Sequence, residues 1–402
     1  MISMFGSGMN AAAVVWYVLQ VTHTEVALGK LLVMQTLPAL FLLPFSGVII
    51  DREDRRHLIM LLDFARGAVV LVIAIMALRG NVQLWQLYVM TVMVAAGFWL
   101  FWPTITALLQ ELTPGGEFVR TNTLLLGGVQ GGWLIAGSVV GFLYNHIGLG
   151  WILVIDFFTY VVSFTCYLMV RKGRVTVQPA SAAAATEALG AWDKYWHELK
   201  EGISYIRARP SVLLLGTSWA LFLGAMLTQG AVTAPLSDRV LHGGAVGYGW
   251  LNGGWGVGAF LSVFYSPALI ARWKSRRAAG YSLGVLALFI FLCPYSRLVW
   301  VAVAMYIIMG SGRGLAGTAL SSEMMELIPK HFMGRVQNTF YLSGTILQLA
   351  LSIAVAEVAH RKSLAAGFAM IAVVYAIACV SAILPDTASQ PAPAALAEAA
   401  GE

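Results

Sequence analysis

Four ionisable residues stand inside long apolar stretches of the chain, where a charge is costly and needs a structural or functional reason. They are Asp63, Glu111, Asp156 and Arg313. A carboxyl group in a low-dielectric environment can take up and release a proton as its access to water changes. We therefore interpret the three acidic residues as candidates for proton coupling. Asp63 also has a purely structural interpretation, as the partner of Arg66 or of the arginines at 52, 55 and 56.

Arg313 is flanked by glycines in the segment Gly310-Ser-Gly-Arg-Gly314. It lies about 13 residues from the C-terminal end of its apolar run, or roughly 20 Å along a helix, which is too far for the side chain to reach the surface easily. Two interpretations remain open. Arg313 anchors an anionic or carboxylate-bearing substrate, or it is the structural partner of a buried acid such as Asp156 or Glu111.

A set of polar and aromatic residues in the apolar stretches is suited to line a substrate cavity. With Arg313 it comprises Asn10, Tyr17, Trp99, Trp102, Gln229, Asn252 and Tyr306. A broad aromatic pocket suits amphiphilic substrates that are poorly specified in shape. Each of these residues taken singly is also explained by packing or by anchoring at the membrane interface.

The composition indicates that lipid, and not water, surrounds most of the chain. Of 402 residues, 59% are hydrophobic and 11% are charged, with a mean hydropathy of +0.78. A typical soluble domain carries roughly 25% charged residues, so a soluble enzyme, a nucleic-acid binder and a disordered protein are excluded. The chain has no phosphate-binding G-x-x-x-x-G-K-[ST] loop and no H-E-x-x-H pair. We therefore expect no enzyme activity, no metal and no cofactor, and a proton gradient as the energy source.

Twelve apolar runs are long enough to cross a membrane, which takes about 20 residues each. They fall at 1–21, 30–48, 58–78, 84–110, 122–145 and 149–170, and then at 211–232, 246–269, 278–294, 298–322, 336–358 and 364–384. The pattern predicts an all-α membrane protein with twelve transmembrane helices in two six-helix pseudo-repeats, 1–170 and 211–385. The interval 171–210 is predicted to be a cytoplasmic linker with an amphipathic helix, and 386–402 a disordered cytoplasmic tail.

The basic residues predict the orientation. With a cytoplasmic N-terminus, 18 of the 25 Lys and Arg residues fall on the inner loops and six on the outer loops, and Arg313 remains within a span. This bias places both termini in the cytoplasm. A multi-pass membrane protein is therefore expected, with membrane lipids around it; the resemblance described below implies the bacterial inner membrane.

The two halves share short signatures, as secondary transporters built from repeats do. Glu111-Leu-Thr-Pro114 reappears as Glu326-Leu-Ile-Pro329. The stretch from Gly47 to Ile59, between the second and third apolar runs, resembles the signature G-x-L-a-D-r-x-G-r-k-x-x-l of the major facilitator superfamily. It departs from this signature at Ile49, Ile50 and Asp54. The resemblance covers nearly the whole chain and implies transport by alternating access.

In that superfamily the signature loop resembles a conformational latch that holds the cytoplasmic side shut. The matching residues are Gly47, Asp51, Arg52, Arg55 and Arg56. A carboxylate such as that of Asp51 can cap the N-terminus of a helix in the other half. The alternative for the arginines is ordinary positive charge on an inner loop.

The segments around the third to seventh runs resemble the exporter branch that includes enterobactin and macrolide efflux proteins. A glycine motif in the fifth run, Gly137-Ser138-Val-Val-Gly141, has Ser where many drug antiporters have Pro. We expect a monomeric, proton-coupled antiporter that exports small organic molecules, such as drugs (as in multidrug resistance), amphiphiles or a siderophore. The alternatives are a lysophospholipid transporter of the same fold and a membrane scaffold or receptor that transports nothing.

Overall fold

The computed structural model describes residues 2–52, 54–112, 118–169 and 184–384. Helices dominate these ranges, and no strand occurs in them. The first six helices are α1 (Ile2–Thr22), α2 (Glu25–Arg52), α3 (Arg55–Leu78), α4 (Leu84–Leu112), α5 (Phe118–Met169) and α6 (Ala184–Arg207). The remaining elements are α7 (Pro210–Thr228), α8 (Gly230–Pro235), η1 (Leu236–Val240), α9 (Gly244–Trp273), α10 (Ser275–Leu292), η2 (Cys293–Tyr295), α11 (Val299–Leu327), α12 (Lys330–Arg361) and α13 (Leu364–Ile383).

The element α5 is two helices joined at a glycine. Its 52 residues would extend about 78 Å as one straight helix, far beyond the roughly 30 Å of a bilayer core. At Gly148 the backbone leaves the helical region, with φ 71° and ψ 178°. Glycine adopts a positive φ at no steric cost. The chain turns back there, so the fifth and sixth predicted spans are both present.

Eleven segments of the described ranges are long and apolar enough to cross a membrane, and the break at Gly148 divides one of them into two. The predicted twelve-helix membrane fold is therefore confirmed. The seventh span is longer than the predicted 211–232: α7, α8 and η1 run on from Pro210 to Val240. Gln229 lies at the junction between α7 and α8.

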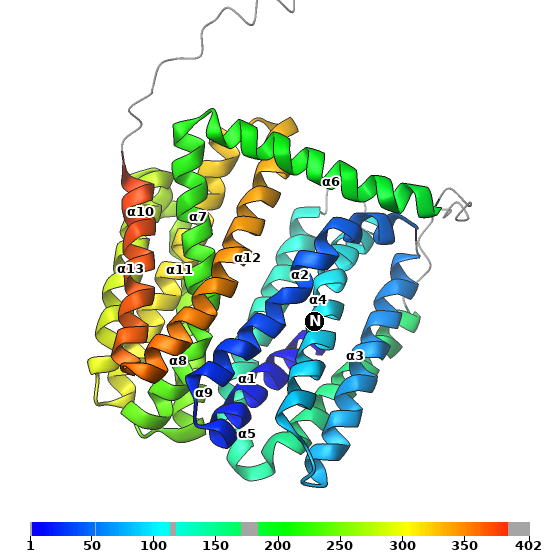
Figure 1. The fold of residues 1–402 in the computed structure, drawn as a ribbon, viewed down its shortest axis with the longest axis vertical. Helices are drawn as coiled ribbons and strands as arrows, with labels where there is room; N and C mark the ends of the chain where they lie inside the picture. Colours follow the sequence, from blue (N-terminus) through cyan, green and yellow to red (C-terminus); the bar gives the residue numbers. More distant parts are fainter. Residues whose placement is uncertain (1, 53, 113–117, 170–183, 385–402) are drawn as a thin grey trace, which may run out of the picture.

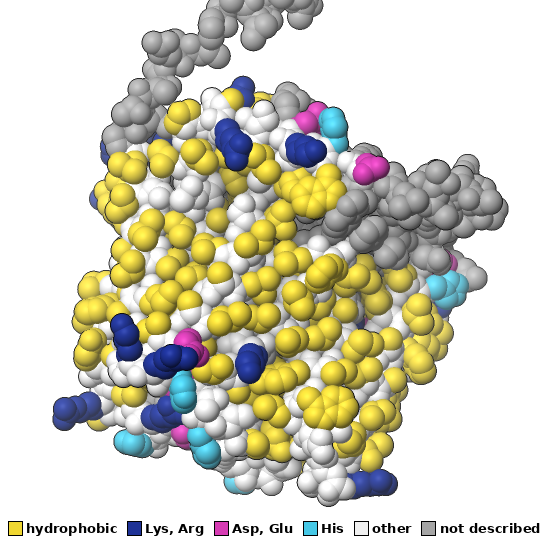
Figure 2. Space-filling model, in the orientation of Figure 1, with side chains coloured by type: hydrophobic (Ala, Val, Ile, Leu, Met, Phe, Trp, Pro, Cys, Tyr) yellow, Lys and Arg dark blue, Asp and Glu magenta, His cyan; other side chains and the backbone are white. Residues whose placement is uncertain are grey.

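The membrane helices form two groups that lie side by side, α1–α5 and α7–α13 (Figure 1). The amphipathic helix α6 lies across one end of the molecule, which we call the linker end. The opposite end holds the turn between α1 and α2, and we call it the Glu25 end. Hydrophobic side chains cover the middle of the face shown in Figure 2, whereas charged side chains gather toward its two ends. This distribution suits a protein surrounded by lipid.

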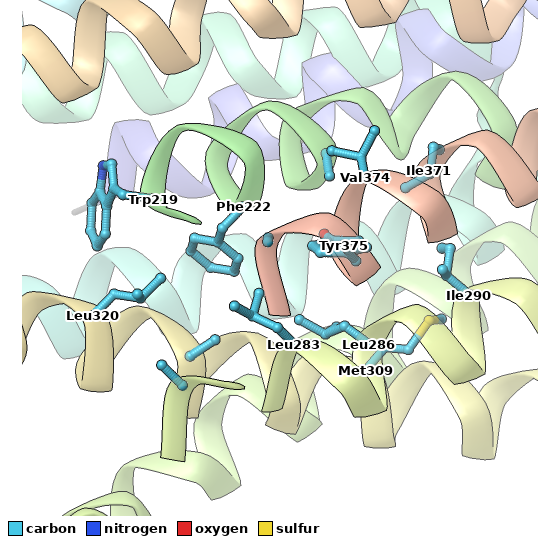
Figure 3. Packing of buried hydrophobic residues seen from close by; sticks show 14 of the residues in the cluster. Trp219, Phe222, Leu283, Leu286, Ile290, Met309, Leu320, Ile371, Val374 and Tyr375 are labelled. Carbon is cyan, nitrogen blue, oxygen red and sulfur yellow. The ribbon is translucent and has the colours of Figure 1, made fainter. Parts of the chain in front are cut away.

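Each group of helices has its own core. In the second group, buried apolar side chains of α7, α10, α11 and α13 interlock, and Figure 3 shows the Tyr375 ring among Phe222, Leu283 and Leu286. In the first group, the core is formed mainly by α1, α3 and α5. Lipid supplies no hydrophobic force between helices, so this interlocking depends on close packing.

Tight contacts between the two groups occur in the parts of the helices nearest the Glu25 end. A Cβ atom added to Gly29 on α2 would lie 2.6 Å from the Ser352 carbonyl oxygen on α12. One added to Gly141 on α5 would lie 2.6 Å from the Gly249 Cα on α9. The rings of Trp16 and Tyr248 stack across the same boundary at 5.7 Å. The glycine motif of the fifth run therefore lies in the contact between the two groups.

Candidate functional site

The first cluster of buried polar residues centres on an ion pair in α3. The Arg66 guanidinium and the Asp63 carboxylate are in contact, one turn apart on the same helix, and are 1% and 0% exposed. Ser163 of α5 donates a hydrogen bond of 2.6 Å to the second carboxylate oxygen of Asp63. The carboxylate is thus neutralised by one cation and oriented by one hydroxyl group. The structural interpretation of Asp63 therefore has direct geometric support.

Aromatic rings enclose the guanidinium of Arg66. The ring centres of Phe101 and Tyr160 lie 4.8 Å and 4.9 Å from its Cζ atom. A Cβ on Gly97 of α4 would lie 2.6 Å from the Arg66 Cδ, so only glycine lets α4 approach this closely. The Nη1 atom of Arg66 is buried and has no hydrogen-bond partner. Arg66 therefore retains unused hydrogen-bonding capacity beside a second carboxylate, described next.

Asp156 is the second carboxylate, and it lies two turns before Ser163 on α5. It is 0% exposed. Asn10 of α1 donates a hydrogen bond of 2.8 Å to its Oδ2 atom, and the Thr159 hydroxyl lies 3.4 Å from its Oδ1 atom. Among the described residues, no Lys, Arg or His nitrogen lies within 4.0 Å of this carboxylate. The charged form of such a group is costly unless a cation or water reaches it.

The residues that surround the two carboxylates lie along one face of α5. Tyr160 stands between Asp156 and Ser163, and its hydroxyl lies 2.8 Å from the Ser7 hydroxyl of α1. Residues three and four apart on a helix are neighbours. This cluster therefore combines two buried carboxylates, Asp63 and Asp156, with one buried arginine, Arg66. Such a cluster can exchange a single proton without leaving its arginine unpaired.

A second cluster surrounds Arg313 in the other group of helices. Its Nε atom donates to the Met226 sulfur at 2.9 Å, and its Cζ atom lies 5.8 Å from the Trp255 ring. The Trp255 ring in turn contacts Tyr306, whose hydroxyl lies 3.0 Å from that of Thr233. No described carboxylate lies within 4.0 Å of Arg313. Since Asp156 is bonded to Asn10 in the other group, it is not the partner of Arg313.

Unused hydrogen-bonding atoms occur in this second group as well. The Oε1 atoms of Gln229 and Gln348 and the hydroxyl of Tyr375 are buried without a partner. Tyr375 is also close enough to Arg313 to interact electrostatically with it. Buried polar atoms without partners are uncommon, and each asks for an explanation such as water or a ligand.

The remaining cavity candidates do not join this cluster. Trp99 donates to the Gln35 carbonyl oxygen of α2 at 3.4 Å. Trp102 packs on a small apolar cluster of α3 and α4, and Tyr17 packs on the core of the first group. Asn252 donates to the Tyr248 carbonyl oxygen at 2.9 Å and lies against Gly137 at the boundary between the groups. Of the predicted set, the structure brings together Gln229, Tyr306 and Arg313.

The signature loop is described only in part. The side chains of Gly47, Asp51, Arg52 and Glu111 lie outside the described residues. Arg56 donates to the Tyr167 and Leu168 carbonyl oxygens at 2.7 Å and 2.8 Å, at the C-terminal end of α5.

Asp54, one of the three residues that depart from the signature, has a local structural role. The carboxylate of Asp54 accepts hydrogen bonds from the backbone N–H groups of Arg56 and His57. Asp54 is therefore the N-cap of α3, a role that glycine would fill less well. The latch remains a prediction.

One cluster of charged residues was missing from the sequence-based prediction. Glu25 of α2 is fully buried, and Arg239 of η1 lies 2.5 Å from it. His360 at the end of α12 lies 3.3 Å from its other carboxylate oxygen. The available signal was an acidic residue at the very start of an apolar helix, but its partners are more than 200 residues away in sequence. Within the described residues, no three side chains of His, Cys, Asp or Glu converge in a way that could hold a metal ion.

Twelve membrane helices in two groups, with buried polar clusters in each, define a multi-pass membrane transporter. The model of the major facilitator superfamily matches residues 1–352, and the chain belongs to this family. Its members are generally transporters and not enzymes. Macrolide efflux protein A of Streptococcus pyogenes is 21% identical over 361 residues, covering 88% of this chain and 84% of that protein. An uncharacterised transporter of Bacillus subtilis is 23% identical over 333 residues, covering 79% and 74%.

Solved structures share the fold at lower identity. A bacterial homologue of the iron transporter ferroportin, in an inward-facing state, superposes with a TM-score of 0.73 and 14% identity. The superposition covers 95% of this chain and 96% of the ferroportin homologue. A nucleoside transporter gives a TM-score of 0.71 at 12% identity, covering 95% and 97%.

Proposed function

We propose that the protein is a proton-coupled exporter of small amphiphilic molecules that carry an anionic group. The observation that carries this proposal is the buried carboxylate of Asp156, which has Asn10 as its hydrogen-bond donor and no described cation within 4.0 Å. In the neighbouring pair, Arg66 already neutralises Asp63. Binding a proton removes the charge of Asp156, and releasing it restores the charge.

The polar face of α5 supports a route for that proton. Ser163, Tyr160 and Asp156 follow one another along the helix, and Ser7 of α1 contacts Tyr160. Asp63 lies toward the linker end of this row, next to Ser163. Hydroxyl and carboxyl groups can both donate and accept, so each can pass a proton to its neighbour.

The cluster in the second group supports the substrate class. Arg313 supplies positive charge and several N–H donors, and no described carboxylate occupies them. Trp255 and Tyr306 supply an aromatic surface beside it. An aromatic wall next to one cation suits an apolar molecule with a carboxylate or another anionic group.

The charge distribution supports the orientation in the membrane that we assume for export. Inner loops carry 18 of the 25 basic residues if the linker end faces the cytoplasm. In that orientation the close contacts between the two groups lie on the outer side. The protein would then load its substrate from the cytoplasm and release it outside while a proton moves inward, as an antiporter of the inner membrane does.

The test uses purified protein in liposomes with an imposed pH gradient. Wild-type protein should concentrate a carboxylate-bearing amphiphilic dye. Asp156→Asn should reduce this gradient-driven accumulation to the level of empty liposomes, because the amide cannot bind or release the proton. Exchange of labelled for unlabelled substrate should persist, because it needs no net proton movement.

The matched control is Asp193→Asn, which removes an exposed carboxylate from α6 and should leave both activities unchanged. Gradient-driven accumulation by Asp156→Asn would contradict the proposal. Movement of lysophospholipid that ignores the pH gradient would favour the lipid-transporting alternative instead.

A further inference from the structure

A buried carboxylate that the proton route does not use joins the two groups of helices at the Glu25 end. Glu25 belongs to α2 in the first group, and its side chain is 0% exposed. Arg239 in η1 and His360 at the end of α12 both belong to the second group. Arg239 also donates to the His23 carbonyl oxygen at 2.5 Å, so it contacts the turn before α2 twice.

We propose that Glu25, Arg239 and His360 form a gate that holds the Glu25 end closed and opens when their charge balance is lost. These three residues are called the charged gate. In the orientation given under Proposed function, this gate faces the outside. The gate itself does not depend on that orientation. The contacts bridge the two groups, so they persist only while the groups stay together.

Burial makes the gate sensitive to each of its members. A buried carboxylate that loses its cation still has the cost of desolvation, but the attraction to the cation no longer offsets it. Separation of the groups would let water reach Glu25, so that loss of a partner favours the open arrangement. One turn along α2, Gly29 packs against Ser352 with no room for a side chain. The charged gate therefore caps a tight helix contact, and opening must break both.

His360 supplies the gate with a second contact to Glu25. Its Nδ1 atom lies 3.3 Å from the Oε2 atom of Glu25, whereas Arg239 contacts the other carboxylate oxygen. The two contacts come from different elements of the second group, α12 and η1.

Other titratable groups surround the gate. His23 and Lys30 are exposed on the side of α2, and Asp238 lies in η1 next to Arg239. On α12, Glu357 and Arg361 form an ion pair with each other. The helix α8 carries no titratable side chain.

The experiment measures the distance between two spin labels on opposite groups. The labels are attached through Arg79→Cys and Arg297→Cys, both exposed at the Glu25 end, after replacement of the three native cysteines. Neither substrate nor a proton gradient is needed, so failure here is distinct from failure of the proposed transport function. Glu25→Gln should raise the ratio of long to short distances by about threefold to tenfold relative to wild type.

Arg239 and His360 are about half exposed, so their variants can be tested even if Glu25→Gln folds poorly. Arg239→Gln should raise the ratio in the same direction, and its combination with Glu25→Gln should add little, because both remove one interaction. The control Glu357→Gln removes a carboxylate at the same end that contacts only its own helix. It should leave the ratio unchanged.

His360→Gln should also raise the ratio of long to short distances, because it removes the second contact to Glu25. Unchanged distances in both Glu25→Gln and Arg239→Gln would overturn the gate. A response of Glu357→Gln as large as that of Glu25→Gln would do so too. An unchanged ratio in His360→Gln alone would remove His360 from the gate.

Discussion

Asp63 and Arg66 form an ion pair in which neither side chain is more than 1% exposed. Removing one member leaves the other charge buried, which typically costs roughly 3–5 kcal/mol. Asp63→Leu and Arg66→Met should therefore each lower the melting temperature in detergent strongly. The double variant should recover much of the loss, since an apolar pair of similar volume replaces the charges. If the double variant melts no higher than the less stable of the two single variants, the two residues act separately.

Gly141 allows α5 and α9 to touch across the boundary between the groups. A Cβ atom there would lie 2.6 Å from both the Ala245 carbonyl oxygen and the Gly249 Cα, so the backbones must separate. Gly141→Ala should weaken closure at the Glu25 end and reduce transport while leaving the fold intact. Spin-label distances across that end should lengthen.

The control for this effect is Gly284→Ala on α10. The added Cβ would meet the Cys379 sulfur at 3.5 Å, which is an ordinary contact within one group. Equal distance changes in the two variants would mean that the effect is not specific to the boundary.

Arg313 has no described carboxylate within 4.0 Å, so its loss should strand no buried anion. Arg313→Ala should abolish binding of carboxylate-bearing ligands, spare neutral ones and leave the melting temperature nearly unchanged. Arg313→Lys should bind the anionic ligands more weakly than wild type, because a single ammonium cannot reproduce the two-point geometry of guanidinium. Ligand binding in detergent, followed by tryptophan fluorescence, measures all three.

A large fall in stability of Arg313→Ala, repaired by Asp156→Ala in the double variant, would contradict this account. It would restore the interpretation in which the arginine is a structural partner of that acid.

Asp54 caps α3 and should make a pH-dependent contribution to stability. Partial burial raises the pKa of Asp54, but hydrogen bonds from the backbone of His57 and Arg56, with the charge of His57, outweigh it and hold the pKa below its usual value. Because the folded state has the lower pKa, the contribution is present above about pH 4 and is lost as the pH falls through the folded-state pKa.

Asp54→Ala should cost about 1 kcal/mol at pH 7, since it removes the N-cap. Its melting temperature should converge with that of the wild type in strongly acidic buffer. Asp54→Asn keeps the cap without the carboxylate, so it should retain most of the stability and lose the pH dependence. An Asp54→Ala deficit that stays constant down to pH 3 would show that the cap contributes nothing through its charge.

The amino-acid sequence by itself determined the number of the membrane helices and where most of them begin and end. In lipid every backbone N–H and C=O must be satisfied within the chain, so a long apolar run has little choice but to be a helix. The turn at Gly148 also follows from local sequence. A glycine between two apolar runs lets the chain turn where a single helix would be too long for the membrane. The buried charges at Asp63, Asp156 and Arg313 were equally visible, since each interrupts an apolar run.

Only the tertiary structure decided which of these charges meet. Asp63 has its arginine one turn away, so periodicity suggested that pair. Asp156 and Asn10 are 146 positions apart, and Glu25 lies 214 and 335 positions from Arg239 and His360. No local pattern records such pairings, because helix packing and the rotation of each helix about its axis decide them. The partner that an ionisable residue finds in a membrane is therefore a property of the assembled bundle.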